Sequence, residues 1–245
     1  MLGANFEREI REQPQVWERL AESDSASRLA AALGDEVVLV GSGSSLNIAE
    51  LGALAFRRRA MHAQALAATE ARLDHCAYER KTVIAISQSG RSADLFEALD
   101  VLKPKRLIAL TNSPDSPLAA RADCAIDVGA GREVAVPASK SVSATAATLL
   151  WAASLIGGDS AREPQVLKRT AREIEAWLTS KAVDEVAAAA HRIAQRTSVI
   201  VLGSDYGLPI ALEAALKLKE ASYLHAEGFA AGEFRHGSVA MVDAS

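Results

Sequence analysis

The chain contains little cysteine, and this shortage bears on metal binding, redox chemistry and the cellular compartment. Two of its 245 residues are cysteine, Cys76 and Cys124. They are isolated and show neither the spacing of a metal site nor that of a redox motif. A metal cofactor is not expected, and this cysteine usage is typical of the reducing cytoplasm.

The chain also lacks an excess of positive charge and a long apolar run. Its formal net charge is −4, and its one basic block, residues 57–59, is typical of a solvated helix end. Nucleic acid is therefore not an expected partner. No apolar run reaches the roughly 20 residues of a membrane span. The charged N-terminus has no signal-peptide core, so we expect no membrane association and a cytoplasmic location.

Strands alternate with helices along the chain, and the apolar fraction of 49% is sufficient for a core. Buried strands are predicted at 37–40, 82–86, 107–111, 125–128 and 199–202, with a strand or loop at 63–68 and a further strand at 239–242. Helices are predicted at 6–20 with a break at Pro14, and at 25–33, 47–58, 93–102, 139–155, 163–179, 184–195 and 210–224. Together they predict an α/β fold with a doubly wound parallel sheet.

A weak internal repeat divides the chain. When Gly41 is aligned with Gly203, Leu46 aligns with Leu208 and Ile48 with Ile210. We therefore predict an N-terminal helical segment over 1–35, a complete α/β domain over 36–158, and a helical linker with an incomplete second domain over 159–245.

Two serine-rich turns follow predicted strands. Gly43-Ser44-Ser45 follows the first, and Ser87-Gln88-Ser89-Gly90-Arg91-Ser92 follows the strand at 82–86. Hydroxyls and free N–H groups at a helix N-terminus favour an anion, and ligands of open α/β sheets bind at the carboxyl ends of strands. The serines could simply cap helices, but two such turns in one domain favour a bound phosphate, above all that of a sugar phosphate.

A nicotinamide site is disfavoured by the first of these turns. The dinucleotide fingerprint G-x-G-x-x-G begins with Gly41 and Gly43, but Leu46 stands where the third glycine belongs.

A second constellation lies in the predicted helix at 210–224 and the segment after it. Glu213, Lys217 and Glu220 have i, i+4, i+7 spacing, which places them on one helical face. The segment 222–237, read as a loop, adds His225, Glu227, Glu233 and His236. The helix could carry a salt-bridged surface stripe and the loop could bind a metal, although the spacing fits no standard zinc pattern. A third interpretation is that this region supplies a carboxylate as a general base and an imidazole as a general acid.

The motifs together resemble the sugar isomerase (SIS) family, in particular the isomerase half of glutamine–fructose-6-phosphate aminotransferase and related deaminases. The resemblance begins at Phe6-Glu7-Arg8-Glu9-Ile10-Arg11-Glu12-Gln13-Pro14 and includes both serine turns and the loop from Glu133 to Lys140. Its longest match runs from Pro209 to Gly237.

The resemblance implies a flavodoxin-like fold and a role for each matched residue. Glu220 would move a proton between C1 and C2 of the sugar, Glu213 and Lys217 would orient the sugar and the base, and His236 of a second subunit would open the ring. The implied substrate is a hexose phosphate or amino-hexose phosphate, the implied assembly a homodimer, and no cofactor is implied. The substrate positions implied are Ser44, Ser45, Ser87, Gln88, Ser89, Ser92 and Val136.

Some positions depart from the family pattern. Ala138 stands where the family loop has a hydroxyl. No glutaminase domain is expected before Met1, which favours free ammonia, deamination or plain isomerisation. The family's second domain continues beyond the position equivalent to Ser245. The chain is therefore expected to be a fragment, or to expose a sheet edge that a partner covers.

Two functions remain open on this basis. The first is an aldose–ketose isomerase or deaminase with Glu220 as its base, favoured by the Glu213, Lys217 and Glu220 face. The second is a sugar-phosphate-binding module, favoured by the incomplete second domain.

Overall fold

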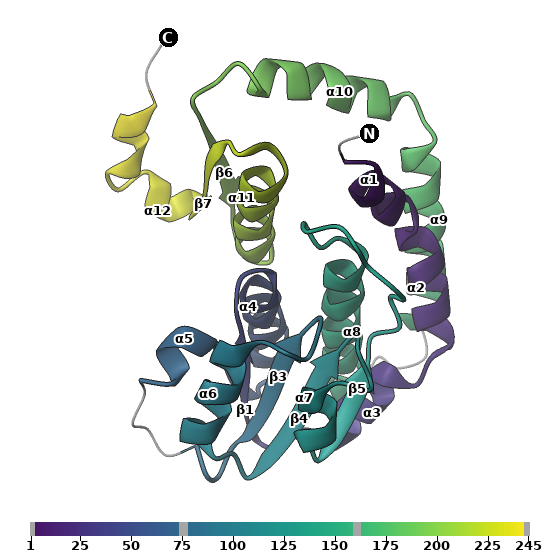
Figure 1. The fold of residues 1–245 in the computed structure, drawn as a ribbon, viewed down its shortest axis with the longest axis vertical. Helices are drawn as coiled ribbons and strands as arrows, with labels where there is room; N and C mark the ends of the chain where they lie inside the picture. The colour runs from purple at the N-terminus through teal and green to yellow at the C-terminus, as the bar shows by residue number, and fades with distance from the viewer. Residues whose placement is uncertain (1–2, 74–77, 159–162, 243–245) are drawn as a thin grey trace. The chain divides into compact units, whose positions relative to one another are not determined.

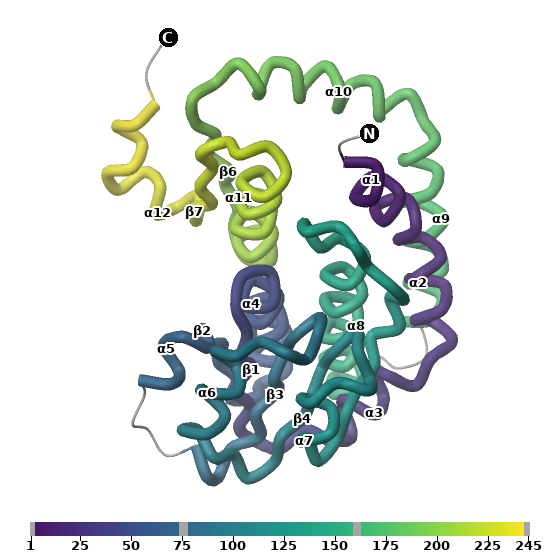
Figure 2. The backbone as a smooth tube through the Cα atoms, viewed as in Figure 1, coloured from purple at the N-terminus to yellow at the C-terminus, as the bar shows by residue number. Residues whose placement is uncertain are grey.

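The computed structural model describes residues 3–73, 78–158 and 163–242. The chain divides into two compact units, Met1–Ser180 and Lys181–Ser245, which are treated separately below. Figures 1 and 2 show the elements of each unit.

The first unit contains a five-stranded parallel sheet in the order β2-β1-β3-β4-β5. Every strand is short, and β3 is buried along its whole length, as expected for a central strand of a parallel sheet. This confirms the predicted doubly wound α/β fold. The strands are β1 (Glu36–Gly41), β2 (His62–Ala67), β3 (Thr82–Ser87), β4 (Arg106–Thr111) and β5 (Cys124–Asp127).

The helices of the first unit cover both faces of this sheet (Figure 1). Pro14 occupies the first turn of α2, which separates α2 from α1 at Glu12, close to the predicted break. The helices are α1 (Ala4–Arg11), α2 (Gln13–Glu22), α3 (Ser25–Ala32), α4 (Ser44–Arg57), α5 (Ala68–Ala71), α6 (Ala93–Leu102), α7 (Pro117–Arg121), α8 (Lys140–Ile156) and α9 (Glu163–Leu178).

Apolar side chains on the two faces of the strands form the core. Val38, Val83 and Leu107 join a buried cluster with α5 and α6 residues. On the other face α4 packs against β1 and α8, so closely that a Cβ at Gly52 would lie 2.9 Å from both Leu39 and Leu149. Alternating side chains thus bury both faces and hold the carboxyl ends of β1 and β3 next to each other.

The second unit repeats the beginning of the first. It contains α10 (Ala182–Ile193), β6 (Ser198–Gly203), α11 (Gly207–Ser222), β7 (His225–Ala230), α12 (Ala231–Phe234) and a 3₁₀ helix η1 (Ser238–Met241). Strands β6 and β7 pair in parallel, and Gly203 faces Ala230 as Gly41 faces Ala67 in the first unit. The order β6-α11-β7-α12 therefore matches β1-α4-β2-α5.

Two predictions for the second unit are wrong. The segment after α11 was predicted to be a loop, but His225–Ala230 is strand β7, because its backbone pairs with β6. The segment 239–242 was predicted to be a strand, but it lies largely in η1. Gly237 has a φ of 124°, and the amides of Ala240 and Val242 donate to the carbonyls three residues earlier, which closes turns instead.

The first compact unit extends to Ser180 and thus includes α9. The physical reason is that α9 packs along α2 (Figure 1). The domain boundary predicted at 158 stays a prediction. Residues 159–162, at the predicted boundary, lie outside the described residues.

Candidate functional site

The two serine-rich turns meet at the carboxyl edge of the first sheet. Strands β1 and β3 are direct neighbours, and each ends at one of the turns. A small hollow of about 40 Å³ lies between them, and Ser44, Ser45 and Gln88 line it. The other lining residues are Ile48, Ile86, Ala138, Ser141, Val142 and Thr145. The hollow is smaller than a sugar phosphate, so it can receive only part of one.

The first turn brings the N-terminus of α4 close to β1. Gly41 ends the strand, and a Cβ there would lie 2.8 Å from the Cβ of Ser45. Gly43 adopts a φ of 57°, which allows the chain to reverse into the helix. Ser44 and Ser45 therefore occupy the first helical positions, where the helix dipole favours an anion.

The second turn is held by hydrogen bonds at both ends. The Ser87 hydroxyl accepts the amide of Gly90 at 3.1 Å, and the Gln88 carbonyl accepts the amide of Asn112 at 3.2 Å. Gly90 has a φ of 61°, and a Cβ there would collide with Ser116. Gln88 is half-buried and lines the hollow, whereas Ser89 is exposed and Ser87 is buried.

Helix capping does not account for Ser92. It occupies the N-cap position of α6, yet among the residues that the structure describes its side chain accepts no hydrogen bond from the helix. Ser116, by contrast, caps α7 by accepting the amide of Ala119 at 3.3 Å. The Ser92 hydroxyl is thus available for another partner at the edge of the second turn.

Helix α8 adds two hydroxyl residues that the sequence reasoning did not assign. Ser141 and Thr145 line the hollow, one helical turn apart, and the Thr145 hydroxyl donates to the Ser141 carbonyl at 2.7 Å. The i, i+4 spacing of hydroxyl residues directly after the loop was a signal that could have identified them. Val136, the loop residue predicted to contact substrate, is 88% exposed and is not among the residues that line the hollow.

In the second unit α11 brings the predicted acid–base residues into contact. Nζ of Lys217 lies 3.4 Å from Oε1 of Glu213 and 2.5 Å from Oε2 of Glu220. The Glu213 side chain is 11% exposed, whereas that of Glu220 is 29% exposed and can meet a ligand. A cation between two carboxylates lowers the cost of burying them and holds Glu220 in one orientation.

The predicted histidines lie on other elements of the second unit. His236 is exposed and follows α12. Within the described part of the chain, no ion pair joins it to Glu213, Lys217 or Glu220. His225 pairs with Glu227 at 3.3 Å on β7. No group of three metal-binding side chains is placed to hold an ion among the described residues.

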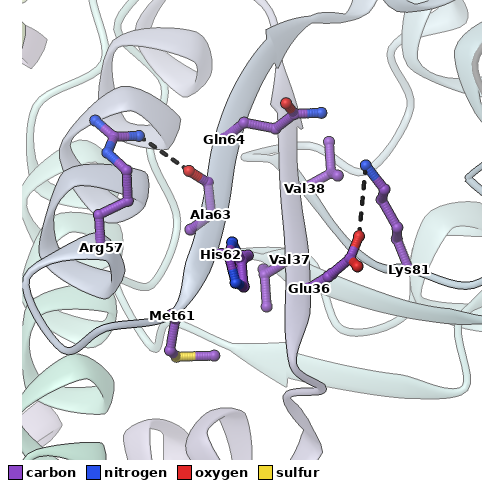
Figure 3. A pocket seen from close by; sticks show the side chains of 9 residues that line it. All are labelled: Glu36, Val37, Val38, Arg57, Met61, His62, Ala63, Gln64 and Lys81. Carbon is purple, nitrogen blue, oxygen red and sulfur yellow. Dashed lines mark hydrogen bonds and ion pairs between the residues drawn. The ribbon is translucent and has the colours of Figure 1, made fainter.

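A different hollow, of about 350 Å³, lies at the amino ends of β1 and β2 (Figure 3). Its charged groups are engaged with the protein itself: Lys81 pairs with Glu36 at 3.6 Å, and Arg57 donates to the Ala63 carbonyl at 3.0 Å. Ligands of parallel sheets bind at the opposite, carboxyl ends of the strands. We therefore place the candidate site at the serine turns.

Comparison with known proteins identifies the family of the chain. The SIS domain model matches residues 34–155 and 192–245, and the chain belongs to the SIS domain family. No helix that the structure describes is long and apolar enough to cross a membrane.

Within this family the chain is similar to glutamine–fructose-6-phosphate aminotransferases. It is 40% identical to that of Mycolicibacterium smegmatis over 72% of this chain and 30% of the relative, and 31% identical to that of Sulfolobus acidocaldarius over 96% and 41%. The chain thus spans less than half the length of these relatives.

A solved structure supports the fold assignment. Glucosamine-6-phosphate deaminase of Thermotoga maritima matches with a TM-score of 0.78 and 26% identity, over 98% of this chain and 73% of that structure. The chain is thus similar to glutamine–fructose-6-phosphate aminotransferases and to a glucosamine-6-phosphate deaminase.

Proposed function

We propose that the chain acts on a hexose 6-phosphate or amino-hexose 6-phosphate, as an aldose–ketose isomerase or deaminase. The observation that carries the proposal is the meeting of Ser44, Ser45 and Gln88 at one hollow at the carboxyl edge of the sheet. Sugar-phosphate relatives of the same family support it.

In this proposal the serine turns hold the phosphate without a metal. The N-terminus of α4 offers a favourable dipole, and the hydroxyls of Ser45 and Ser92 and the amide of Gln88 donate hydrogen bonds. The Ser87 hydroxyl holds the second turn in shape by accepting the amide of Gly90. Ser89 lies on the exposed side of that turn. Binding the phosphate, which does not react, supplies energy that holds the sugar in place.

Glu220 is the proposed base. Removal of a proton beside a carbonyl requires a carboxylate that is held in position and reaches the substrate. The bond to Lys217 holds the Glu220 carboxylate, and its partial exposure leaves it accessible. Glu213 in turn holds Lys217 from the buried side. A homodimer in which His236 of the second subunit opens the sugar ring belongs to the same proposal.

The test is proton NMR in D₂O with fructose 6-phosphate and glucosamine 6-phosphate in separate samples. We expect the C1 or C2 proton to exchange for deuterium, with or without release of ammonia. Glu220→Gln is expected to lower the exchange rate by at least about a hundredfold, because loss of a general base typically costs 10²–10⁴-fold. Its ligand binding should remain.

Control variants make this test specific. Glu227→Gln removes another carboxylate of the second unit, and Lys219→Gln removes an exposed lysine of α11; both should exchange like the wild type. Exchange that survives in Glu220→Gln would refute its role as base. Binding of sugar phosphate with no exchange in any variant would instead identify a sugar-phosphate-binding module.

A further inference from the structure

The motif at residues 6–14 is not explained by the proposed chemistry, although it begins the resemblance. Two of its glutamates contact the segment between β5 and α8: Glu9 is buried, whereas Glu12 is partly exposed and pairs with the first residue of α8. Glu9 lies on α1 and is 1% exposed, and Glu12 lies at the junction of α1 and α2. A buried carboxylate is costly unless it is paired or hydrogen-bonded, so its partners indicate its purpose.

Glu9 binds the backbone of the loop. Its Oε1 accepts the amide of Val134 at 2.6 Å, and its Oε2 accepts the amide of Ala135 at 3.1 Å. These are charge-assisted bonds to two successive amides, from a residue more than a hundred positions earlier in the chain. The next residue, Val136, is strongly exposed. Glu9 therefore fixes the segment that presents Val136.

A second carboxylate fixes the other end of the loop. Glu133 accepts the amide of Ser139 at 2.9 Å and that of Ser141 at 3.3 Å, and it accepts the Ser141 hydroxyl. It thus caps the N-terminus of α8, whose own N-cap residue, Ser139, makes no side-chain cap. Through Ser141, this contact reaches the hollow itself.

Glu9 anchors the start of the loop and Glu133 anchors its end. Lys140, the first residue of α8, is held by Glu12 at the junction of α1 and α2. It is 4% exposed, and its Nζ lies 2.5 Å from Oε2 of Glu12. A buried ammonium group requires such a partner. The first residue of α8 is therefore tied to the α1–α2 junction, and Ala138, which lines the hollow, lies between the anchors.

We propose that Glu9 and Glu12 are positioning residues that hold loop 133–139 against the sugar-phosphate site, so that the loop contacts the sugar rather than the phosphate. The side chains from Val134 to Ala138 are all apolar, and such a segment offers backbone groups and apolar surface to a sugar but no charge to a phosphate. This inference rests on the proposed function, because it assigns a role at the same site.

The test compares Glu9→Gln with Glu7→Gln. Both glutamates lie on α1, but the Glu7 side chain is 66% exposed and pairs with Arg11 of the same helix at 3.0 Å. In Glu9→Gln the NH₂ group replaces one of the two accepting oxygens and would face a loop N–H as a second donor, so one of the two hydrogen bonds is lost. We expect hydrogen exchange at the amides of Val134 and Ala135 to accelerate at least tenfold in Glu9→Gln and not in Glu7→Gln.

Ligand binding is measured on the same proteins by calorimetry. Glu9→Gln is expected to bind fructose 6-phosphate about tenfold more weakly, the equivalent of one charge-assisted hydrogen bond. Its affinity for inorganic phosphate should stay at the wild-type value, because the serine turns are untouched. General destabilisation would weaken both ligands, so this difference is specific to positioning. Glu9→Asp keeps the charge, so its affinity for fructose 6-phosphate should lie between those of the wild type and Glu9→Gln. It replaces Glu9→Gln in the comparison if Glu9→Gln does not fold.

Three outcomes would overturn the inference. They are unchanged affinity for fructose 6-phosphate in Glu9→Gln, equal weakening of sugar phosphate and inorganic phosphate, and unchanged exchange of the two loop amides. If the wild type binds neither ligand, the proposed function fails. The exchange comparison then still decides whether Glu9 holds the loop, so the two failures are distinguishable.

Discussion

At the scale of single residues, buried charges in this chain are matched to specific partners. Glu9 meets two amides, Lys140 meets Glu12, and Glu213 meets Lys217. In each case the partner offsets the loss of hydration, and the geometry of the partner then orients the group. The partner of each of these three buried charged groups therefore also holds its side chain in one orientation.

Glu50 on α4 differs, because burial raises its pKa. Since the folded state favours the protonated form, the contribution of Glu50 to stability is fully present below its ordinary pKa and is lost as the pH rises through the raised value. Glu50→Gln is neutral throughout, so we expect it to raise the melting temperature at pH 7.5 relative to wild type by more than it does at pH 4. Thermal unfolding by circular dichroism measures this difference.

The control for Glu50 is Glu18→Gln, an exposed glutamate of α2. Its melting temperature should follow that of the wild type at both pH values. A Glu50→Gln protein whose shift is the same at pH 4 and pH 7.5 would contradict the assignment.

At the scale of elements, the turns between strand and helix carry the candidate site. Each turn contains a glycine with a positive φ, Gly43 in the first and Gly90 in the second, a conformation that residues with a Cβ disfavour. In the second unit Gly203 approaches Gly207 more closely than Gly41 approaches Ser45, but Tyr206 and Gly207 occupy the positions of Ser44 and Ser45. The shared glycine is explained by packing, whereas the pair of serines at the start of the helix is specific to the first unit.

The contribution of the Gly90 turn can be measured with a matched pair of variants. Gly90 and Gly129 have φ values of 61° and 66°, but only a Cβ at Gly90 would meet other atoms, those of Ser116 and Leu118. We expect Gly129→Ala to lower the free energy of unfolding by about 1 kcal/mol through backbone strain alone. Gly90→Ala should lower it by at least about 2 kcal/mol, because a steric clash is added.

Denaturant unfolding of both variants measures this difference. Gly90→Ala should also bind inorganic phosphate more weakly than Gly129→Ala, because its turn carries Gln88. Equal losses of stability in the two variants would show that Ser116 moves aside without cost.

The elements that the sequence predicted poorly are those whose residues have weak intrinsic preference. Residues 82–86 are β-branched and apolar and were predicted as strand, as found. The segment His-Ala-Glu-Gly-Phe-Ala was predicted as loop, because neither alanine nor glycine favours strand structure. It forms β7 because β6 offers a row of backbone partners, which no local pattern reveals.

At the scale of the whole molecule, the two units bury their strands to different degrees. Five of the six residues of β1 are buried, whereas none of the six in β6 is fully buried. Backbone hydrogen bonds covered by less apolar contact open more easily. We expect the amides of β6 to exchange at least ten times faster than those of β1.

Hydrogen exchange read by mass spectrometry tests this difference on the intact chain. Peptides from β3, which is wholly buried, provide the internal reference for the slowest exchange. Equal protection of β1 and β6 would show that the second unit is as well covered in solution as the first, for example by a second copy of the chain.

The sequence by itself determined the class of fold, the order of most elements and the serine turns, because periodicity, β-branching and glycine act within a few residues. It also placed Glu213, Lys217 and Glu220 on one helical face, since helical spacing is local. Only the tertiary structure decided that Ser141 and Thr145 line the hollow. It alone also decided that Glu9 and Lys140 are buried, where Glu9 binds loop 133–139 and Lys140 pairs with Glu12. These contacts join residues about fifty to more than a hundred positions apart in the chain. The physical reason is that such pairings depend on how the helices pack on the sheet, not on local preference.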